Sequence, residues 1–100
     1  MATYLELKAL FNDSDLMDRV QVAAVIVASD FLENTPTAAQ KAWASAVFDS
    51  PRAEAKKLLM AVLADKKSMS VSEIQALTDA NIKNRVAIVA PFMVDAMAGA

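Results

Sequence analysis

The chain has 100 residues, of which 56% are hydrophobic, and it carries a net charge of −2 at pH 7. This length supports one domain with a thin core, and the acidic balance excludes the dense basic surface on which nucleic-acid binding depends. Cysteine and histidine are both absent, which removes disulfides, thiolate metal ligands and most of the usual general bases and nucleophiles. We therefore expect a protein that is not an enzyme and holds no cofactor or metal.

The N-terminal segment carries Glu6 and Lys8 where a signal peptide needs an apolar region. The longest apolar run, Val86 to Val94, is about half as long as a membrane-spanning helix requires, and it contains Pro91. We therefore expect a protein that is made and kept in the cytosol and has no membrane partner.

Two helices are predicted in the first third of the chain. Thr3 and Glu6 have capping-box spacing and predict a short first helix. Asp13 or Ser14 then caps a second helix that runs to about Asn34. The apolar residues that define the inner face of the second helix are Leu16, Val20, Ala23, Ala24, Val27 and Phe31.

Four further helices have start signals of their own. In the first three a hydroxyl side chain precedes a proline, Glu or Gln, and in the fourth a hydroxyl or carboxylate side chain caps the helix. These signals are Thr35-Pro36-Thr37 with Gln40, Ser50-Pro51, Ser70 with Glu73, and Thr78 or Asp79. Each signal is followed by apolar residues at helical spacing. In the same order, these residues are Ala39, Trp43, Ala46 and Val47 for the first helix, Ala55, Leu58, Leu59, Val62 and Leu63 for the second, Ile74 and Leu77 for the third, and Ile82, Val86, Val89, Phe92, Met93 and Ala96 for the last.

Pro91 lies inside the last of these helices and predicts a kink there, because proline removes the hydrogen bond to the carbonyl of residue 87. The only glycine is Gly99, so the Gly-rich turns of β-proteins are missing. The sequence therefore predicts an all-α fold: a compact bundle of five to six short-to-medium helices forming a single domain over residues 1–100, with the last helix kinked at Pro91.

The second helix lacks a fully polar side. At 100° per residue, Asp18, Val22, Val25, Ser29 and Glu33 fall on one stripe, and two valines interrupt it. Either this face meets another protein chain, or the helix is central and the other helices surround it. The candidate residues for an oligomer or partner interface are Val22, Val25, Ile26, Trp43, Phe92 and Met93. For Trp43 the alternative is a place in the core, which is common for an aromatic residue at helical spacing.

Two charged groups invite a chemical interpretation. Asp13, Asp15 and Asp18 have carboxylates for a divalent cation, but they lack the turn glycine and terminal glutamate of a calcium loop, so helix capping explains them better. The candidate basic patch consists of Arg52, Lys56, Lys57, Lys66 and Lys67, diluted by Glu54 and Asp65. It is either a solvated helical face or a surface for an acidic partner or DNA.

Several segments resemble small helical virion proteins of tailed bacteriophages, and the resemblance covers most of the chain. These segments are Thr3 to Lys8, Asn12 to Leu16, Ala42-Trp43-Ala44 and Ala53 to Leu63. The order of a short helix, an acidic turn and a long apolar helix is also similar to the head–tail connector, or adaptor, family, which forms rings beneath the portal.

The resemblance implies a non-enzymatic structural protein of the virion, made in the host cytoplasm, that assembles into a ring at the portal or neck. Its implied partners are further copies of itself and portal, neck or capsid proteins, without sequence-specific nucleic-acid binding. The alternatives are a capsid- or tail-associated virion protein, a small regulatory module that grips an amphipathic helix, and an enzyme that relies only on carboxylates or lysine.

Overall fold

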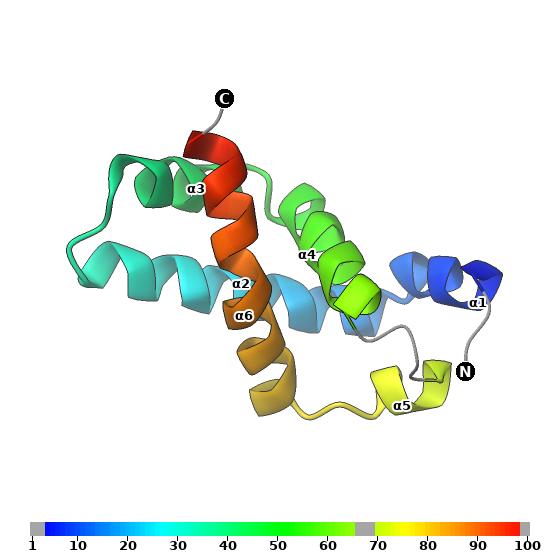
Figure 1. The fold of residues 1–100 in the computed structure, drawn as a ribbon. Helices are drawn as coiled ribbons and strands as arrows, with labels where there is room; N and C mark the ends of the chain where they lie inside the picture. Colours follow the sequence, from blue (N-terminus) through cyan, green and yellow to red (C-terminus); the bar gives the residue numbers. More distant parts are fainter. Residues whose placement is uncertain (1–3, 66–69, 99–100) are drawn as a thin grey trace.

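A computed structural model describes residues 4–65 and 70–98 of the chain, and the described residues form helices and no strand (Figure 1). In chain order the helices are α1 (Tyr4–Ala9), the 3-10 helix η1 (Leu10–Asn12), α2 (Ser14–Glu33), α3 (Ala38–Asp49), α4 (Pro51–Asp65), α5 (Val71–Gln75) and α6 (Asp79–Ala98). The predicted all-α bundle is confirmed.

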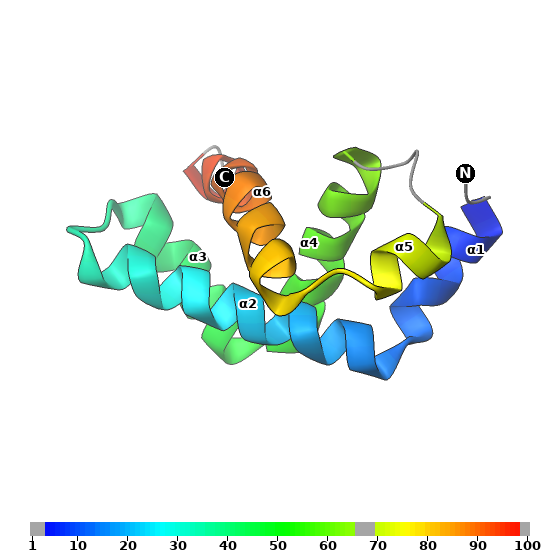
Figure 2. The same ribbon diagram turned by 90° about the horizontal axis from the view of Figure 1, so that it is seen from below.

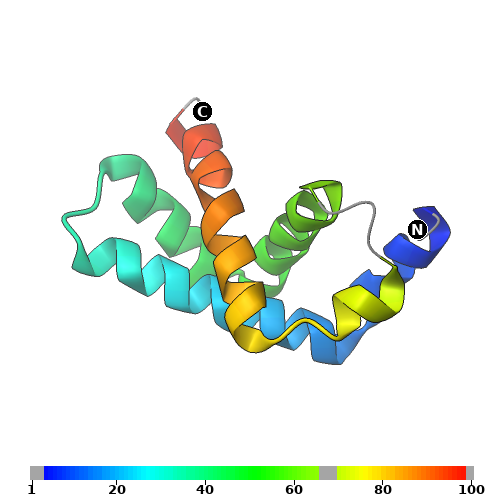
Figure 3. The same ribbon diagram turned by 60° about the horizontal axis from the view of Figure 1, so that its bottom comes forward.

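Helix α2 organises the bundle, because α3, α4 and α6 all pack against it. The chain reverses after α2, so that α3 runs back along it, while α4 and α6 pack on one side of α2 and contact each other (Figures 1 and 2). The short helices α1 and α5 lie together at the end where α2 begins (Figure 3). The molecule measures 39 × 25 × 20 Å, and α2, about 30 Å long by its helical rise, lies along the longest dimension.

Most of the predicted helix starts are confirmed. Asp13 caps α2, since its Oδ1 accepts a hydrogen bond from the backbone N–H of Leu16 at 3.1 Å. Capping boxes join Thr37 to Gln40 and Ser70 to Glu73, and Thr78 accepts from the backbone N–H of Asn81. Thr3, the first residue of the remaining predicted box, lies outside the described residues.

The start of α3 decides between two neighbouring signals in the sequence, Pro36 at the first helical position and the capping box of Thr37 with Gln40. The capping box is the one that forms, because α3 begins at Ala38, directly after Thr37. The reciprocal bonds between Thr37 and Gln40 fix the start at that point, and Thr35 is held in the left-handed region at a φ of 51°. Pro51, by contrast, is the first residue of α4, as predicted.

The core consists of side chains from α2 and from the three helices packed against it, together with Leu10 of η1 and Ile74 of α5. The five residues predicted inward on α4, which are Ala55, Leu58, Leu59, Val62 and Leu63, are all buried. On α2, Leu16, Val20, Ala23, Ala24 and Val27 are buried as predicted, together with Met17 and Ala28, which the periodicity argument left out. Phe31 is only half-buried and packs against this cluster.

Helix α6 continues through Pro91 as one element. Ala87 and Pro91 are both exposed, so water can satisfy the carbonyl that proline leaves without an intrahelical donor. The proline is therefore accommodated on the outer side of the helix, and the bend expected there stays a prediction.

Candidate functional site

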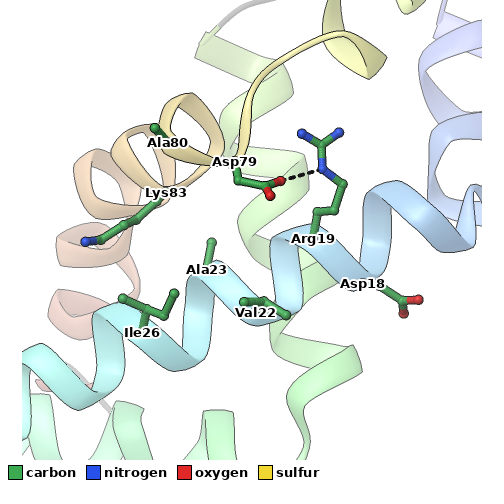
Figure 4. Close-up of a pocket in the computed structure, with 8 residues that line it drawn as sticks. All are labelled: Asp18, Arg19, Val22, Ala23, Ile26, Asp79, Ala80 and Lys83. Atoms are coloured by element: carbon green, nitrogen blue, oxygen red, sulfur yellow. Dashed lines mark hydrogen bonds and ion pairs between the residues drawn. The ribbon is translucent and has the colours of Figure 1, made fainter.

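A groove runs between the middle of α2 and the start of α6 (Figure 4). Its volume is about 380 Å³. It is lined by Asp18, Arg19, Val22, Ala23 and Ile26 from α2 and by Asp79, Ala80 and Lys83 from α6. We call these eight residues the α2–α6 groove.

The surface of the groove is apolar because valine, isoleucine and alanine occupy its centre. Val22 is 59% exposed, and Ile26 is also exposed, whereas Ala23, which points toward α6 (Figure 4), is buried. The β-branched side chains of Val22 and Ile26, one helical turn apart, are thus exposed to solvent on the long helix α2. Sequence periodicity had singled out Val22, and the structure places it on the surface and not in the centre of the bundle.

Charged residues form the rim of the groove, and most of them are already paired. The Nε of Arg19 lies 2.7 Å from Oδ1 of Asp79, and the two side chains face each other across the groove (Figure 4). Oδ1 of Asp18 lies 2.5 Å from a guanidinium nitrogen of Arg52. Lys83 is exposed and makes no ion pair with another described residue. The groove therefore carries one uncommitted positive charge beside its apolar surface.

The other candidate interface residues separate into distinct environments. Val25 and Met93 are half-buried and pack against the core, so each offers less surface to a partner than Val22 does. Phe92, in contrast, is exposed on α6. Ile88 is also exposed, one helical turn before Phe92, and was not among the predicted interface residues. The spacing of four residues between Ile88 and Phe92 was the signal that would have found this pair.

Trp43 is a core residue, which corrects its selection as a candidate for the interface. It is 1% exposed, and its ring meets the ring of Phe31 edge to face at a centroid distance of 5.7 Å. The core alternative is therefore the right one for this residue. The reason is the position of α3, whose inner side carries Trp43 and Val47 against the bundle.

The candidate basic patch is largely neutralised where it is described. Arg52 pairs with Asp18, and Nζ of Lys57 lies 3.1 Å from Oε1 of Glu54. Lys56 is exposed and borders a shallow hollow beside Met60. Lys66 and Lys67 lie outside the described residues. Within the described part, the arrangement is that of a solvated helical face with its own counter-charges.

Asp13 and Asp18, near the start of α2, each form hydrogen bonds or an ion pair within the fold. Asp13 accepts from the Leu16 backbone N–H and from Nε2 of Gln75, and these hydrogen bonds lower the pKa of its carboxyl below 3.8. Asp18 holds Arg52. In the part of the chain that the structure describes, acidic residues nowhere gather in a group of three or more that could hold a metal ion.

No protein-family model, curated protein or solved structure matches this chain. Among the described residues, no helix combines the length and hydropathy needed to cross a membrane.

Proposed function

We propose that this chain is a non-enzymatic structural subunit that assembles with copies of itself through the α2–α6 groove. The observation that carries the proposal is the exposure of Val22 and Ile26 side by side on α2, the helix against which α3, α4 and α6 pack. Apolar residues in such a position are stabilised by a second protein surface, since burial removes them from water.

We further propose that the assembly is a ring in a tailed-phage particle, at the portal or neck, where the subunit acts as a head–tail connector or adaptor. The resemblance of the sequence segments to small helical virion proteins supports this assignment. A ring requires head-to-tail contacts between two different surfaces, because a contact that pairs one surface with itself stops at a dimer.

The groove also has the composition of a site for an amphipathic helix of another protein. In that case the chain would be a binding module, and it would stay monomeric until its partner is present. If the chain is instead a capsid- or tail-associated virion protein, it would be found on the capsid or the tail of the particle and not at the neck.

Light scattering across a concentration series tests the proposal. A discrete multiple of the 10.7 kDa chain mass, seen as rings by electron microscopy, is the expected result. Immunogold labelling of phage particles that contain the chain would then distinguish the neck from the capsid or tail. A persistent monomer would contradict self-assembly and favour the binding module.

A further inference from the structure

We infer that the outer side of α6 on one copy of this chain docks into the α2–α6 groove of the next copy. This inference rests on the proposed self-assembly and names the two surfaces that form the contact. The outer α6 face is defined here as Ile88, Phe92 and Asp95. These residues follow one another at spacings of four and three, so they lie on one side of the helix.

The outer α6 face is apolar where a helix of a monomer should be polar. Ile88 and Phe92 are exposed, as are Ala87 and Pro91 beside them. Over this half of the helix the solvent side therefore presents an isoleucine and a phenylalanine one turn apart. An aromatic and a branched aliphatic side chain in this arrangement are typical anchors for an apolar groove.

Charge complementarity selects a second copy as the occupant. The groove has one uncommitted positive charge, Lys83, whose side chain lies on the Ile26 side of the groove (Figure 4). The outer α6 face has one negative charge, Asp95, which is exposed and forms no ion pair with any described residue. Apolar surface thus meets apolar surface while opposite charges meet at the rim.

The position of Asp95 strengthens this assignment, because the fold itself does not benefit from an acid there. Asp95 lies in the last turn of α6, and this turn contains no basic residue before the helix ends at Ala98. The carboxyl end of a helix carries partial negative charge, so an anion in the last turn is unfavourable. A lysine from a neighbouring copy would neutralise both the carboxylate and the helix end.

The two surfaces also differ, which is what a closed ring or an open filament needs. The start of α6 forms one wall of the groove, and its second half carries the outer face. Each copy therefore offers one acceptor and one donor surface. Such a contact is heterologous and repeats from copy to copy.

Complementation between two variants tests this inference. Val22→Glu places a charge in the groove, Phe92→Glu places one on the outer face, and Met60→Glu is a matched control on α4 with similar exposure. We expect Val22→Glu and Phe92→Glu each to raise the dissociation constant at least about tenfold, with helical circular dichroism unchanged. Mixing these two variants should yield a heterodimer, because the groove of one and the outer face of the other are intact.

The outcomes of this experiment are distinguishable from those for the proposed function. A wild type that stays monomeric overturns both, and it would assign the groove to another protein. A wild type that assembles while Phe92→Glu assembles equally well overturns only the docking of α6. Failure of the mixed variants to associate, despite native helicity in both, would also contradict a head-to-tail contact.

A charge exchange tests the pairing of Lys83 with Asp95. Lys83→Glu and Asp95→Lys should each weaken assembly by about fivefold at low salt, whereas the chain carrying both changes should return to near the wild-type dissociation constant. If the double variant is weaker than either single one, these two residues do not meet.

Discussion

The Nε atom of Arg19 lies 2.7 Å from Oδ1 of Asp79, a residue 60 positions later in the chain. The same guanidinium donates to the backbone carbonyl of Leu77 and, at 3.4 Å, to that of Gln75. Arg19 therefore fastens the connection between α5 and α6 to the side of α2. Since this connection sets where α6 begins, Arg19 also fixes one wall of the α2–α6 groove.

Replacing Arg19 with alanine should destabilise the fold by about 1–2 kcal/mol, because two carbonyls lose a charged donor. Asp79→Asn should lower the free energy of unfolding by less than about 1 kcal/mol, because an ion pair with an exposed partner contributes little. The Asp79 side chain is 86% exposed, whereas that of Arg19 is only 23% exposed. Arg19→Lys keeps the charge without the planar fork and should lose most of what alanine loses. Urea unfolding of the three variants measures these differences. A larger loss for Asp79→Asn than for Arg19→Ala would contradict the carbonyl contacts.

Trp43 provides an optical check on which residues lie in the interface. It is the only tryptophan of the chain, and its indole is buried against Phe31. We expect blue-shifted emission that acrylamide quenches poorly and that does not change as the protein is diluted through its assembly transition. A red shift on dissociation would place Trp43 at the contact between copies.

Acid should weaken the start of α2 and of α5. Hydrogen bonds from the Leu16 backbone N–H and the Gln75 amide lower the pKa of Asp13, and the Ser70 hydroxyl and backbone N–H lower the pKa of Glu73. A carboxyl whose pKa is lower in the folded state than in the unfolded state stabilises the fold at any pH above its unfolded-state pKa, which is 3.8 for Asp13. This contribution is lost as the pH falls through the pKa of the folded state.

The contribution of Asp13 can be isolated with Asp13→Asn, which keeps an oxygen for the Leu16 N–H and no longer titrates. The melting temperature of the wild type should therefore fall more between about pH 6 and pH 3 than that of the variant. Equal slopes for the two proteins would mean that Asp13 has the same pKa in the folded and unfolded states.

The sequence was sufficient for the helices, because their boundaries depend on local chemistry. The capping boxes at Thr37 and Ser70, and Pro51 at the start of α4, are short-range interactions that the order of residues specifies. The apolar repeat of α4 likewise identified its buried side correctly. These features require no knowledge of which helices are neighbours.

The candidate site was less predictable because it depends on how helices meet. Periodicity put Val22 and Val25 on one stripe, yet Val22 is open while Val25 packs against the core. The contact of Arg19 with Asp79 joins segments far apart in the sequence, and no local pattern indicated it. Trp43 was ambiguous for the same reason, since only the packing of α3 decides whether its side chain meets the core or a partner.

Duplex DNA should bind weakly at most. The net charge is −2, and the cations Arg52 and Lys57 are each paired with an acid of the same chain. Fluorescence anisotropy with a labelled duplex at low and physiological salt measures this, with Lys56→Glu as a comparison. Tight binding that weakens steeply with salt, and that Lys56→Glu reduces, would show that the basic residues form a phosphate-binding surface after all.

The most direct test of assembly through the groove is the mass of Val22→Glu beside that of Met60→Glu, measured by sedimentation equilibrium at matched concentrations. The two replaced side chains are 59% and 61% exposed, so the variants differ in location and hardly in burial. We expect the wild type and Met60→Glu to form the same discrete oligomer and Val22→Glu to remain a 10.7 kDa monomer with native helicity. Full assembly of Val22→Glu would contradict a role for the α2–α6 groove in holding the copies together.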